Sequence, residues 1–277
     1  MSERKKILNN NYLINNGWIK VKLNNSKKSA LHHAHVSILK FLKKLIPTLT
    51  CLEEYHKYIM SDNDHLEVQV LVSDYFQNKN FIYDIVYENL SNLTPFIGLD
   101  LMLQKKPYLR IARPMKIIDN IGFHRDTSYG SSPYELSLSI PLCNITKMGS
   151  LSVISKSHRW PDIDLNSKFI DSDRVTKNSK LHKLGFPYSP IIIPNTITRQ
   201  ANPIHTKFGE GLLFSLSLIH GQEVNKSRFT RFQTDVRLVN SLAVFNNHRS
   251  SAAEYYEQLI ETPATYNARY FQAINTN

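Results

Sequence analysis

Between Glu135 and Leu142, leucine or isoleucine occupies every second position. On an extended backbone, successive side chains point to opposite faces, whereas a helix would scatter these residues around its axis. Leu136, Leu138, Ile140 and Leu142 therefore share one face, and Ser137 and Ser139 share the other. The segment predicts a β-strand with one apolar face.

Other short apolar runs follow Pro95, and turn residues separate them. They are Leu101–Leu103, Tyr108–Ala112, Leu151–Ile154, Pro190–Ile193, Leu212–Leu218 and Phe232–Val239. Several short strands joined by loops are typical of a β-sandwich or barrel.

The chain before Pro95 has a helical pattern instead. Apolar residues recur at helical spacing from Ala30 to Ile46, where Pro47 ends the run, and residues Phe81 to Leu93 predict another helix. Ala252 to Ile260 predicts a last short helix. We expect the N-terminal helices to pack on the outside of the β-structure.

Lysine and arginine exceed aspartate and glutamate by 34 to 23, a formal net charge of +11. This favours anionic partners such as nucleic acid or phosphorylated metabolites, although a Lys- and Asn-rich composition explains it equally well. Two cysteines cannot build a disulfide framework, which fits a reducing compartment. No stretch approaches the ~20 apolar residues of a membrane span, and the polar start lacks the apolar run of a signal sequence. We expect a cytoplasmic protein without a membrane partner.

His124 and Asp126 form the most informative motif. Residues two apart on an extended backbone share a face, so this imidazole and this carboxylate can take neighbouring positions on a metal. His220, at the end of a strand-like run, is the best third ligand. Two histidines and one carboxylate form the facial triad of non-haem Fe(II) oxygenases. Alone the motif is weak, because the chain has 11 histidines.

Arg231 follows His220 by eleven residues, on the next predicted strand. Arg231, Gln233, Asp235 and Arg237 share one face of that strand. The face either meets solvent or lines a cavity, where an arginine can bind a carboxylate through two hydrogen bonds.

Four matches together make the chain resemble the Fe(II)/2-oxoglutarate-dependent oxygenases of the phytanoyl-CoA dioxygenase-like superfamily. They are His124-x-Asp126, the stretch Gly149 to His158, His220-Gly221 followed by Asn225 and Ser227, and Arg231. In the second match, Ser155-Lys156 stands where the family has Pro-Gly. Patterns around Arg110, Asp126 and Thr230 look like oxygenases of sporadic carbohydrate-biosynthesis clusters.

The resemblance implies one oxygenase domain with a double-stranded β-helix, or jelly-roll, core at residues 96–245. A helical part at 1–95 and a C-terminal helix and tail at 246–277 would flank it. It implies Fe(II), 2-oxoglutarate and O2 as cofactor and cosubstrates. The implied metal ligands are His124, Asp126 and His220, while Arg231 and Ser137 would bind 2-oxoglutarate.

The implied reaction is hydroxylation or oxidation of a C–H bond in a small polar or anionic molecule, with release of succinate and CO2. A sugar or sugar derivative is the favoured substrate, with Arg113, Tyr129, Asp235 and Arg237 as candidate contacts. Asp126 is retained, which disfavours halogenation. Other open alternatives are an acyl-CoA or amino-acid substrate, a nucleic-acid or protein hydroxylase, and a non-enzymatic jelly-roll binding protein; nucleic acid is the less favoured partner. The long segment Trp160 to Tyr188 is either an active-site lid or an ordinary insertion.

Overall fold

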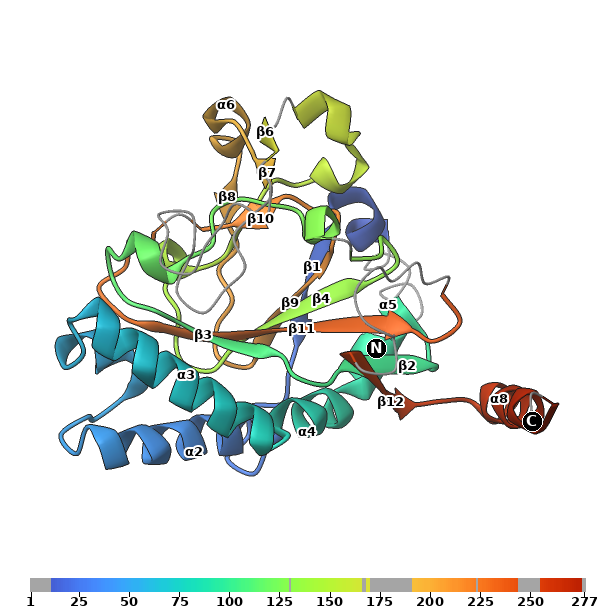
Figure 1. Ribbon diagram of the computed structural model, residues 1–277, viewed down its shortest axis with the longest axis horizontal. Coiled ribbons are helices and arrows are strands. Elements are labelled where there is room, and N and C mark those ends of the chain that lie inside the picture. The colour runs from blue at the N-terminus through green and yellow to red at the C-terminus, as the bar shows by residue number, and fades with distance from the viewer. Residues whose placement is uncertain are drawn as a thin grey trace.

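A computed structural model shows a major β-sheet with a layer of helices on one side and a smaller sheet on the other (Figure 1). It describes residues 11–129, 131–165, 168–169, 191–222, 224–243 and 255–275. Most of the segment 160–188 lies outside these residues. The prediction that this segment is a lid or an ordinary insertion therefore concerns a part of the chain that is not described.

The major sheet is antiparallel, and its seven strands come from almost the whole chain. In sheet order they are β1 (Trp18–Lys22), β9 (Glu210–Ser215), β4 (Leu136–Pro141), β11 (Arg231–Asn240), β2 (Leu101–Gln104) and β12 (Tyr256–Ile260), with β3 (Tyr108–Ala112) also paired to β11. A smaller sheet contains β10 (His220–Gly221), β5 (Ser152–Val153) and β8 (Asn202–Pro203), and β6 (Lys168–Phe169) pairs with β7 (Ile191–Ile192). This is the jelly-roll architecture that the resemblance implied.

Helices cover the outer face of the major sheet (Figure 1). They are α2 (Ala30–Leu45), α3 (Asp62–Asn78), α4 (Phe81–Glu88) and α5 (Leu90–Ile97). Shorter helical elements are η1 (Leu52–Lys57), η2 (Ile117–Asp119), η3 (Asp126–Tyr129), η4 (Lys147–Gly149), η5 (Ser157–Arg159), η6 (Asp162–Leu165) and α6 (Asn195–Thr198), and α8 (Pro263–Asn275) projects from the body of the molecule.

The apolar face of the strands faces this helical layer. Helix α2 buries a stripe at helical spacing that includes Leu31 and Ile38, and strand residues Leu138, Ile140 and Val236 belong to the same hydrophobic core. Because side chains alternate along a strand, the polar residues of β4 and β11 must point to the opposite side, toward the interior of the jelly roll.

The sheet extends beyond the predicted 96–245 core at both ends. Strand β1 adds an edge strand to β9, and β12 pairs with β2. The helix predicted over Ala252 to Ile260 is therefore wrong for its described residues 256–260. Sheet pairing and burial of Tyr256 and Leu259 outweigh local helical preference there.

The predicted helix from Phe81 to Leu93 is two helices that meet at Asn89. The buried amide of Asn89 donates to the carbonyl of Ile85 (2.8 Å) and accepts from the backbone N–H of Asn24 (2.8 Å). A side chain that competes for backbone groups in this way interrupts a helix.

Strands β2 and β3 pair with the same edge of β11, and a wide bulge separates them. Leu103 lies opposite Leu238 and Tyr108 opposite Asp235, so residues 104–107 face only residues 236–237. The side-chain oxygen of Gln104 accepts the backbone N–H of Arg237 (3.1 Å). Such bulges bend a strand and redirect its side chains.

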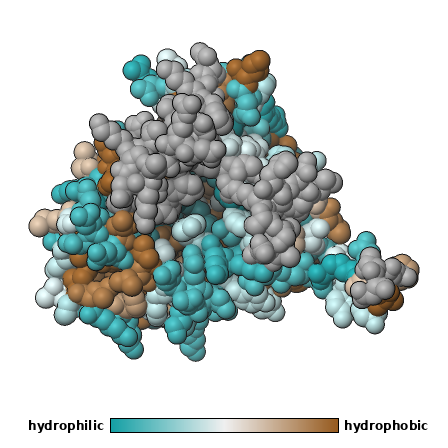
Figure 2. Space-filling model, in the orientation of Figure 1, coloured by the Kyte–Doolittle hydropathy of each residue, from teal (hydrophilic) through white to brown (hydrophobic). Residues whose placement is uncertain are grey.

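The surface in this view is mostly hydrophilic, with an apolar patch at the left over the helical layer (Figure 2). Val70 and Leu71 of α3 are among the exposed apolar side chains. Within the described ranges, no helix combines the length and the apolar character that a membrane span requires.

Candidate metal centre

The structure brings the three predicted metal ligands together. One side-chain nitrogen or oxygen from each of His124, Asp126 and His220 lies within 4.8 Å of the other two. His124 Nε2 is 3.7 Å from Asp126 Oδ1, and His220 Nε2 is 3.9 Å from Asp126 Oδ2. All three residues are at most 9% exposed.

Backbone hydrogen bonds hold the two histidines side by side. The N–H of His124 donates to the carbonyl of His220 (2.9 Å), and the N–H of His220 donates to the carbonyl of His124 (3.0 Å). Asp126 opens the short helix η3, and its N–H donates to the carbonyl of Leu216 (3.0 Å). Backbone pairing between residue 124 and strand β10 thus positions the two histidines.

Each imidazole is oriented by the backbone carbonyl two residues before it. Nδ1 of His124 lies 2.8 Å from the oxygen of Gly122, and Nδ1 of His220 lies 2.9 Å from the oxygen of Leu218. A carbonyl only accepts, so each Nδ1 carries the proton and each Nε2 lone pair points to the cluster. Burial, together with the neighbouring His124, lowers the pKa of His220 to about 4, which keeps it neutral near pH 7.

Arg237 binds the carboxylate ligand. Its Nη2 donates to Asp126 Oδ1 (3.1 Å), and its Nη1 donates to the hydroxyl of Tyr255 (2.8 Å). Burial opposes ionisation of Asp126, but Arg237 and the two histidines hold its pKa well below its usual range. Arg237, which we predicted to contact substrate, is therefore placed on the metal ligand.

The donor set fits a divalent metal. Two neutral imidazole nitrogens and one ionised carboxylate, all buried and convergent, are the ligands of the Fe(II) facial triad. Because each ligand is held by a second hydrogen bond, the site can bind an ion without rearranging its side chains.

Arg231 is a buried cation surrounded by neutral acceptors. It is 4% exposed, and its Nη1 donates to the carbonyl of Gly149 (3.1 Å) and to the side-chain oxygen of Gln222. Its Nη2 donates to Asn120 Oδ1 (2.9 Å), and no described atom accepts from its Nε. Burial lowers the pKa of Arg231 to about 10, so it remains charged at neutral pH.

A narrow cavity of about 30 Å³ is shared by Arg231, His124 and His220. Asn120 and Gln222 also line it. Neither amide was predicted from the sequence. The only available signal was that Gln222 follows His220 by two residues, a spacing that places side chains on one face of a strand.

A larger cavity of about 510 Å³ opens from the metal ligands along the major sheet. Its lining is Gln104, Lys106, Tyr108, Arg110, Ile121, His124, Asp126, Ser137, Phe214, His220, Asp235, Arg237 and Tyr255. We call this the main cavity. Here the polar face of β11 meets a cavity rather than open solvent, with Asp235 paired to Arg110 (3.2 Å).

Ser137 lines the main cavity but is far from Arg231. In the register of β4 and β11, Ser137 lies opposite Arg237, six residues along from Arg231. At about 3.3 Å per residue this separates the two positions by roughly 20 Å. The structure does not bring them to one carboxylate, contrary to our expectation.

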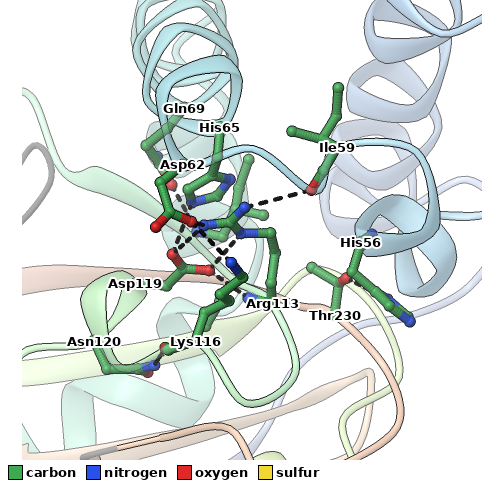
Figure 3. A network of polar contacts seen from close by, with 12 residues as sticks. His56, Ile59, Asp62, His65, Gln69, Arg113, Lys116, Asp119, Asn120 and Thr230 are labelled. Atoms are coloured by element: carbon green, nitrogen blue, oxygen red, sulfur yellow. Dashed lines mark hydrogen bonds and ion pairs between the residues drawn. The ribbon is translucent and has the colours of Figure 1, made fainter.

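Arg113 lies outside the main cavity, in a buried network between the helices and the jelly roll (Figure 3). Its Nε and Nη2 donate to the two oxygens of Asp119, both at 2.9 Å, and Nη2 also donates to Asp62 (2.7 Å). We expected Arg113 at the substrate, and the structure does not bring it there. The side chain of Tyr129, another predicted contact, is outside the described residues.

Two further positions of the resembled stretch, Gly149 and Lys156, are constrained by their local surroundings. A Cβ on Gly149 would lie 3.0 Å from Asn225 Oδ1 and 3.1 Å from Ser227 Oγ, so this spot favours glycine. Lys156, which stands where the resembled stretch has glycine, adopts a left-handed φ of 71°. Glycine adopts that conformation without strain, which gives a physical reason for the family pattern.

Comparisons with known proteins identify the fold. No family model and no curated protein matches the sequence. The structure is similar to a non-heme monooxygenase, the ThoJ–nickel complex, at 12% identity and a TM-score of 0.51, covering 91% of this chain and 83% of that one.

Two enzymes of nogalamycin biosynthesis are similar as well. The epimerase SnoN, solved with Fe3+, alpha ketoglutarate and nogalamycin RO, matches at 11% identity and a TM-score of 0.51, covering 95% of this chain and 92% of that one. The alpha ketoglutarate-dependent carbocyclase SnoK matches at 12% identity and a TM-score of 0.50, covering 95% of this chain and 93% of that one. The chain therefore has the fold of solved non-haem enzymes of this kind.

A second large cavity, of about 550 Å³, lies on the side of the smaller sheet. Its lining includes Phe123, Gln222, Arg199 and Lys226, but none of the three metal ligands. We call it the rear cavity.

Proposed function

We propose that the protein is an Fe(II)- and 2-oxoglutarate-dependent oxygenase that hydroxylates or oxidises a C–H bond of a small polar molecule, with release of succinate and CO2. One observation carries the proposal. His124 and His220, the two histidines of the cluster with Asp126, share a cavity with Arg231, a buried cation whose described partners are all neutral.

The chain's own residues would hold the metal on one face. His124 and His220 present Nε2 lone pairs because their Nδ1 protons are bound to carbonyls, and Arg237 keeps Asp126 ionised and oriented. Bound Fe(II) would supply the redox and Lewis-acid centre for O2 and 2-oxoglutarate.

Arg231 would bind the far carboxylate of 2-oxoglutarate. A guanidinium pairs with a carboxylate through charge-assisted hydrogen bonds, which are stronger than bonds to neutral amides. The present acceptors on Asn120 and Gln222 would then flank the cosubstrate.

The main cavity supports a sugar or sugar derivative as substrate. Its wall combines a carboxylate, guanidinium groups and the rings of Tyr108 and Tyr255, a mixture that suits hydroxyl groups. A fatty acyl chain would place its apolar surface against Asp235 and Arg110 and remove water from both charges.

The first experiment tests the metal site. His124→Ala, Asp126→Ala and His220→Ala should each abolish succinate formation that depends on 2-oxoglutarate, and each should weaken anaerobic Fe(II) binding in equilibrium dialysis. His33→Ala, an exposed histidine of α2, is the matched control. Full activity in any folded triad variant would remove that residue from the site, and a wild-type protein that binds no Fe(II) would sink the proposal.

The second experiment tests the substrate. Nucleotide sugars, sugar phosphates, free sugars, acyl-CoA compounds and amino acids are compared for stimulation of succinate formation above the uncoupled background. We expect saccharides to stimulate. Stimulation by acyl-CoA or amino acids alone would defeat the sugar assignment and leave the iron chemistry intact.

A further inference from the structure

The main cavity carries two cations that the metal centre does not use: Lys106 at its outer end, and Arg110, which also lines the narrow cavity. Lys106 and Arg110 line this cavity, and Lys106 and Tyr108 are exposed, so the cavity reaches solvent at this end. We propose that Lys106 and Arg110 bind a phosphoryl group of the substrate, which makes the substrate a phosphorylated sugar. This inference rests on the proposed function and adds the substrate class.

The bulge of the major sheet places Lys106 in this position. Residues 104–107 face only residues 236–237 of β11, so Lys106 is not in a regular pair. Gln104, Lys106, Tyr108 and Arg110 nevertheless alternate along the chain and all line the main cavity. The irregularity thus brings an additional lysine onto the wall that carries Asp235 and Arg237.

Among the described residues, the main cavity and the narrow cavity together carry more positive than negative charge. Four cationic side chains line them, Lys106, Arg110, Arg231 and Arg237, against the carboxylates of Asp126 and Asp235. Asp119 also lines the narrow cavity, but both its oxygens are bound by Arg113. Two positive charges remain, and they persist in the loaded site because Fe(II) and the 2-oxoglutarate dianion cancel.

Two of these cations already have assigned partners near the metal. Arg237 holds Asp126, and Arg231 is assigned to 2-oxoglutarate. Arg110 Nε forms an ion pair with Asp235 Oδ2 at 3.2 Å. Lys106 forms no ion pair with any carboxylate in the described part of the chain. Because Arg110 is already paired with Asp235, one of the two residual charges lies at the outer end of the cavity, on Lys106.

A phosphate monoester complements this end. Near pH 7 it carries about 1.5 to 2 negative charges and three acceptor oxygens. A lysine ammonium is a compact point charge, and an arginine adds directed donors, so the pair matches a phosphoryl group. Tyr108 lines the same cavity and provides aromatic surface for a sugar ring between the phosphate and the metal, while the guanidinium of Arg237 lies over the ring of Tyr255 at 5.8 Å.

The test compares Lys106→Gln with Lys105→Gln in the full-length protein. Both variants remove one positive charge from the same bulge, but Lys105 lines a different, small cavity. Titration calorimetry with Mn(II) and 2-oxoglutarate present measures binding of hexose 1-phosphates, hexose 6-phosphates, the matching free hexoses and inorganic phosphate.

We expect the wild type to bind at least one phosphorylated sugar more tightly than its free hexose. Lys106→Gln should weaken that binding about 10- to 100-fold, because it removes a charge-assisted hydrogen bond. Lys105→Gln should change it by less than about 2-fold, since exposed charges outside the site contribute little. Thermal melts that match the wild type show that both variants fold.

Three outcomes would overturn the inference. Free hexoses bind as tightly as their phosphates; no probe shows dependence on Lys106; or phosphate binding is lost in Lys226→Gln, which would place the anion in the rear cavity. 2-Oxoglutarate binding is measured in a separate titration of the protein with Mn(II) present. If it persists while Lys106 has no effect, only the inference fails; if it is absent, the proposed function fails independently.

Discussion

Two buried arginines, Arg113 and Arg231, have opposite surroundings. Arg113 is 1% exposed and donates to both oxygens of Asp119, to Asp62 and to backbone carbonyls (Figure 3). Arg231 is 4% exposed and donates to a carbonyl and two amides, with no described carboxylate within bonding distance.

This is the difference that we expect between a structural arginine and one that binds a ligand. Burying an unpaired charge is costly, so a fold that only needs to be stable supplies a counter-ion, as it does for Arg113. A site that must receive an anion leaves the charge to its ligand, as we propose for Arg231. The two sites are linked, because Asn120, which binds Arg231, follows Asp119 directly in the chain.

The largest effect on stability should come from Asp119→Asn. Breaking a buried ion pair leaves Arg113 without its main counter-ion, which costs about 3–5 kcal/mol. Urea unfolding followed by circular dichroism measures this loss. Arg231→Gln is the comparison and should lower the free energy of unfolding much less. Equal losses in the two variants would show that the arginines do not differ in role.

Arg231→Gln should instead affect the cosubstrate. Truncating one partner of a buried charge pair costs about 2–5 kcal/mol, so the 2-oxoglutarate concentration at half-saturation should rise at least about 30-fold. Fe(II) binding should stay unchanged, since Arg231 does not contact the ligands. An unchanged half-saturation value would reassign the cosubstrate to Arg228 or Arg237.

His65 lies beside the buried network of Arg113, and its protonation provides a test of that network. Its Nε2 lies 3.5 Å from Asp119 Oδ1, and burial lowers the pKa of His65 from 6.5 to about 4. Between these values the unfolded chain binds a proton that the folded protein does not bind, so stability is present above pH 6.5 and is lost as the pH falls toward 4.

The His65 contribution amounts to about 3 kcal/mol over that window. Unfolding free energies at pH 7 and pH 4.5 measure it, and His65→Gln should flatten the dependence. If the slope persists in His65→Gln, other groups titrate there and His65 is not kept neutral by burial.

The smallest effect should come from Asp62→Asn. Asp62 also binds Arg113, but its side chain is 45% exposed and solvent screens the pair. We expect a loss of at most about 1 kcal/mol in urea unfolding, with Lys116→Gln, its other partner, as the control. A loss as large as that of Asp119→Asn would mean that both carboxylates are needed to neutralise Arg113.

Local patterns predicted much of the fold and the ligand set. The strand from Tyr108 to Ala112 has its predicted bounds, and the alternation of residues 135–142 marks a strand whose apolar side packs on the helices. These features depend on near neighbours in the sequence, so periodicity detects them. His124 and Asp126 were found for the same reason, although Asp126 begins a short helix rather than extending a strand.

Features set by distant pairing were not predictable. Nothing local marks residues 256–260 as a strand, because the pairing with β2 is formed across the sequence. The distance of Ser137 from Arg231 depends on the register of two strands about a hundred residues apart. Asn120 and Gln222 contact Arg231 only because the folded jelly roll brings them together, and no sequence motif predicts them.

The reciprocal backbone bridge between His124 and His220 has a consequence for metal supply. The two peptide hydrogen bonds, at 2.9 and 3.0 Å, involve no metal, so the donors are arranged by the sheet itself. Folding then cannot discriminate between ions, in contrast to a site that assembles only around its metal. Such a site accepts Co, Ni or Zn according to the affinity series of divalent metals. Loading with iron would depend on which ions the cell keeps available, and preparations stripped and reloaded with another metal should remain folded and inactive.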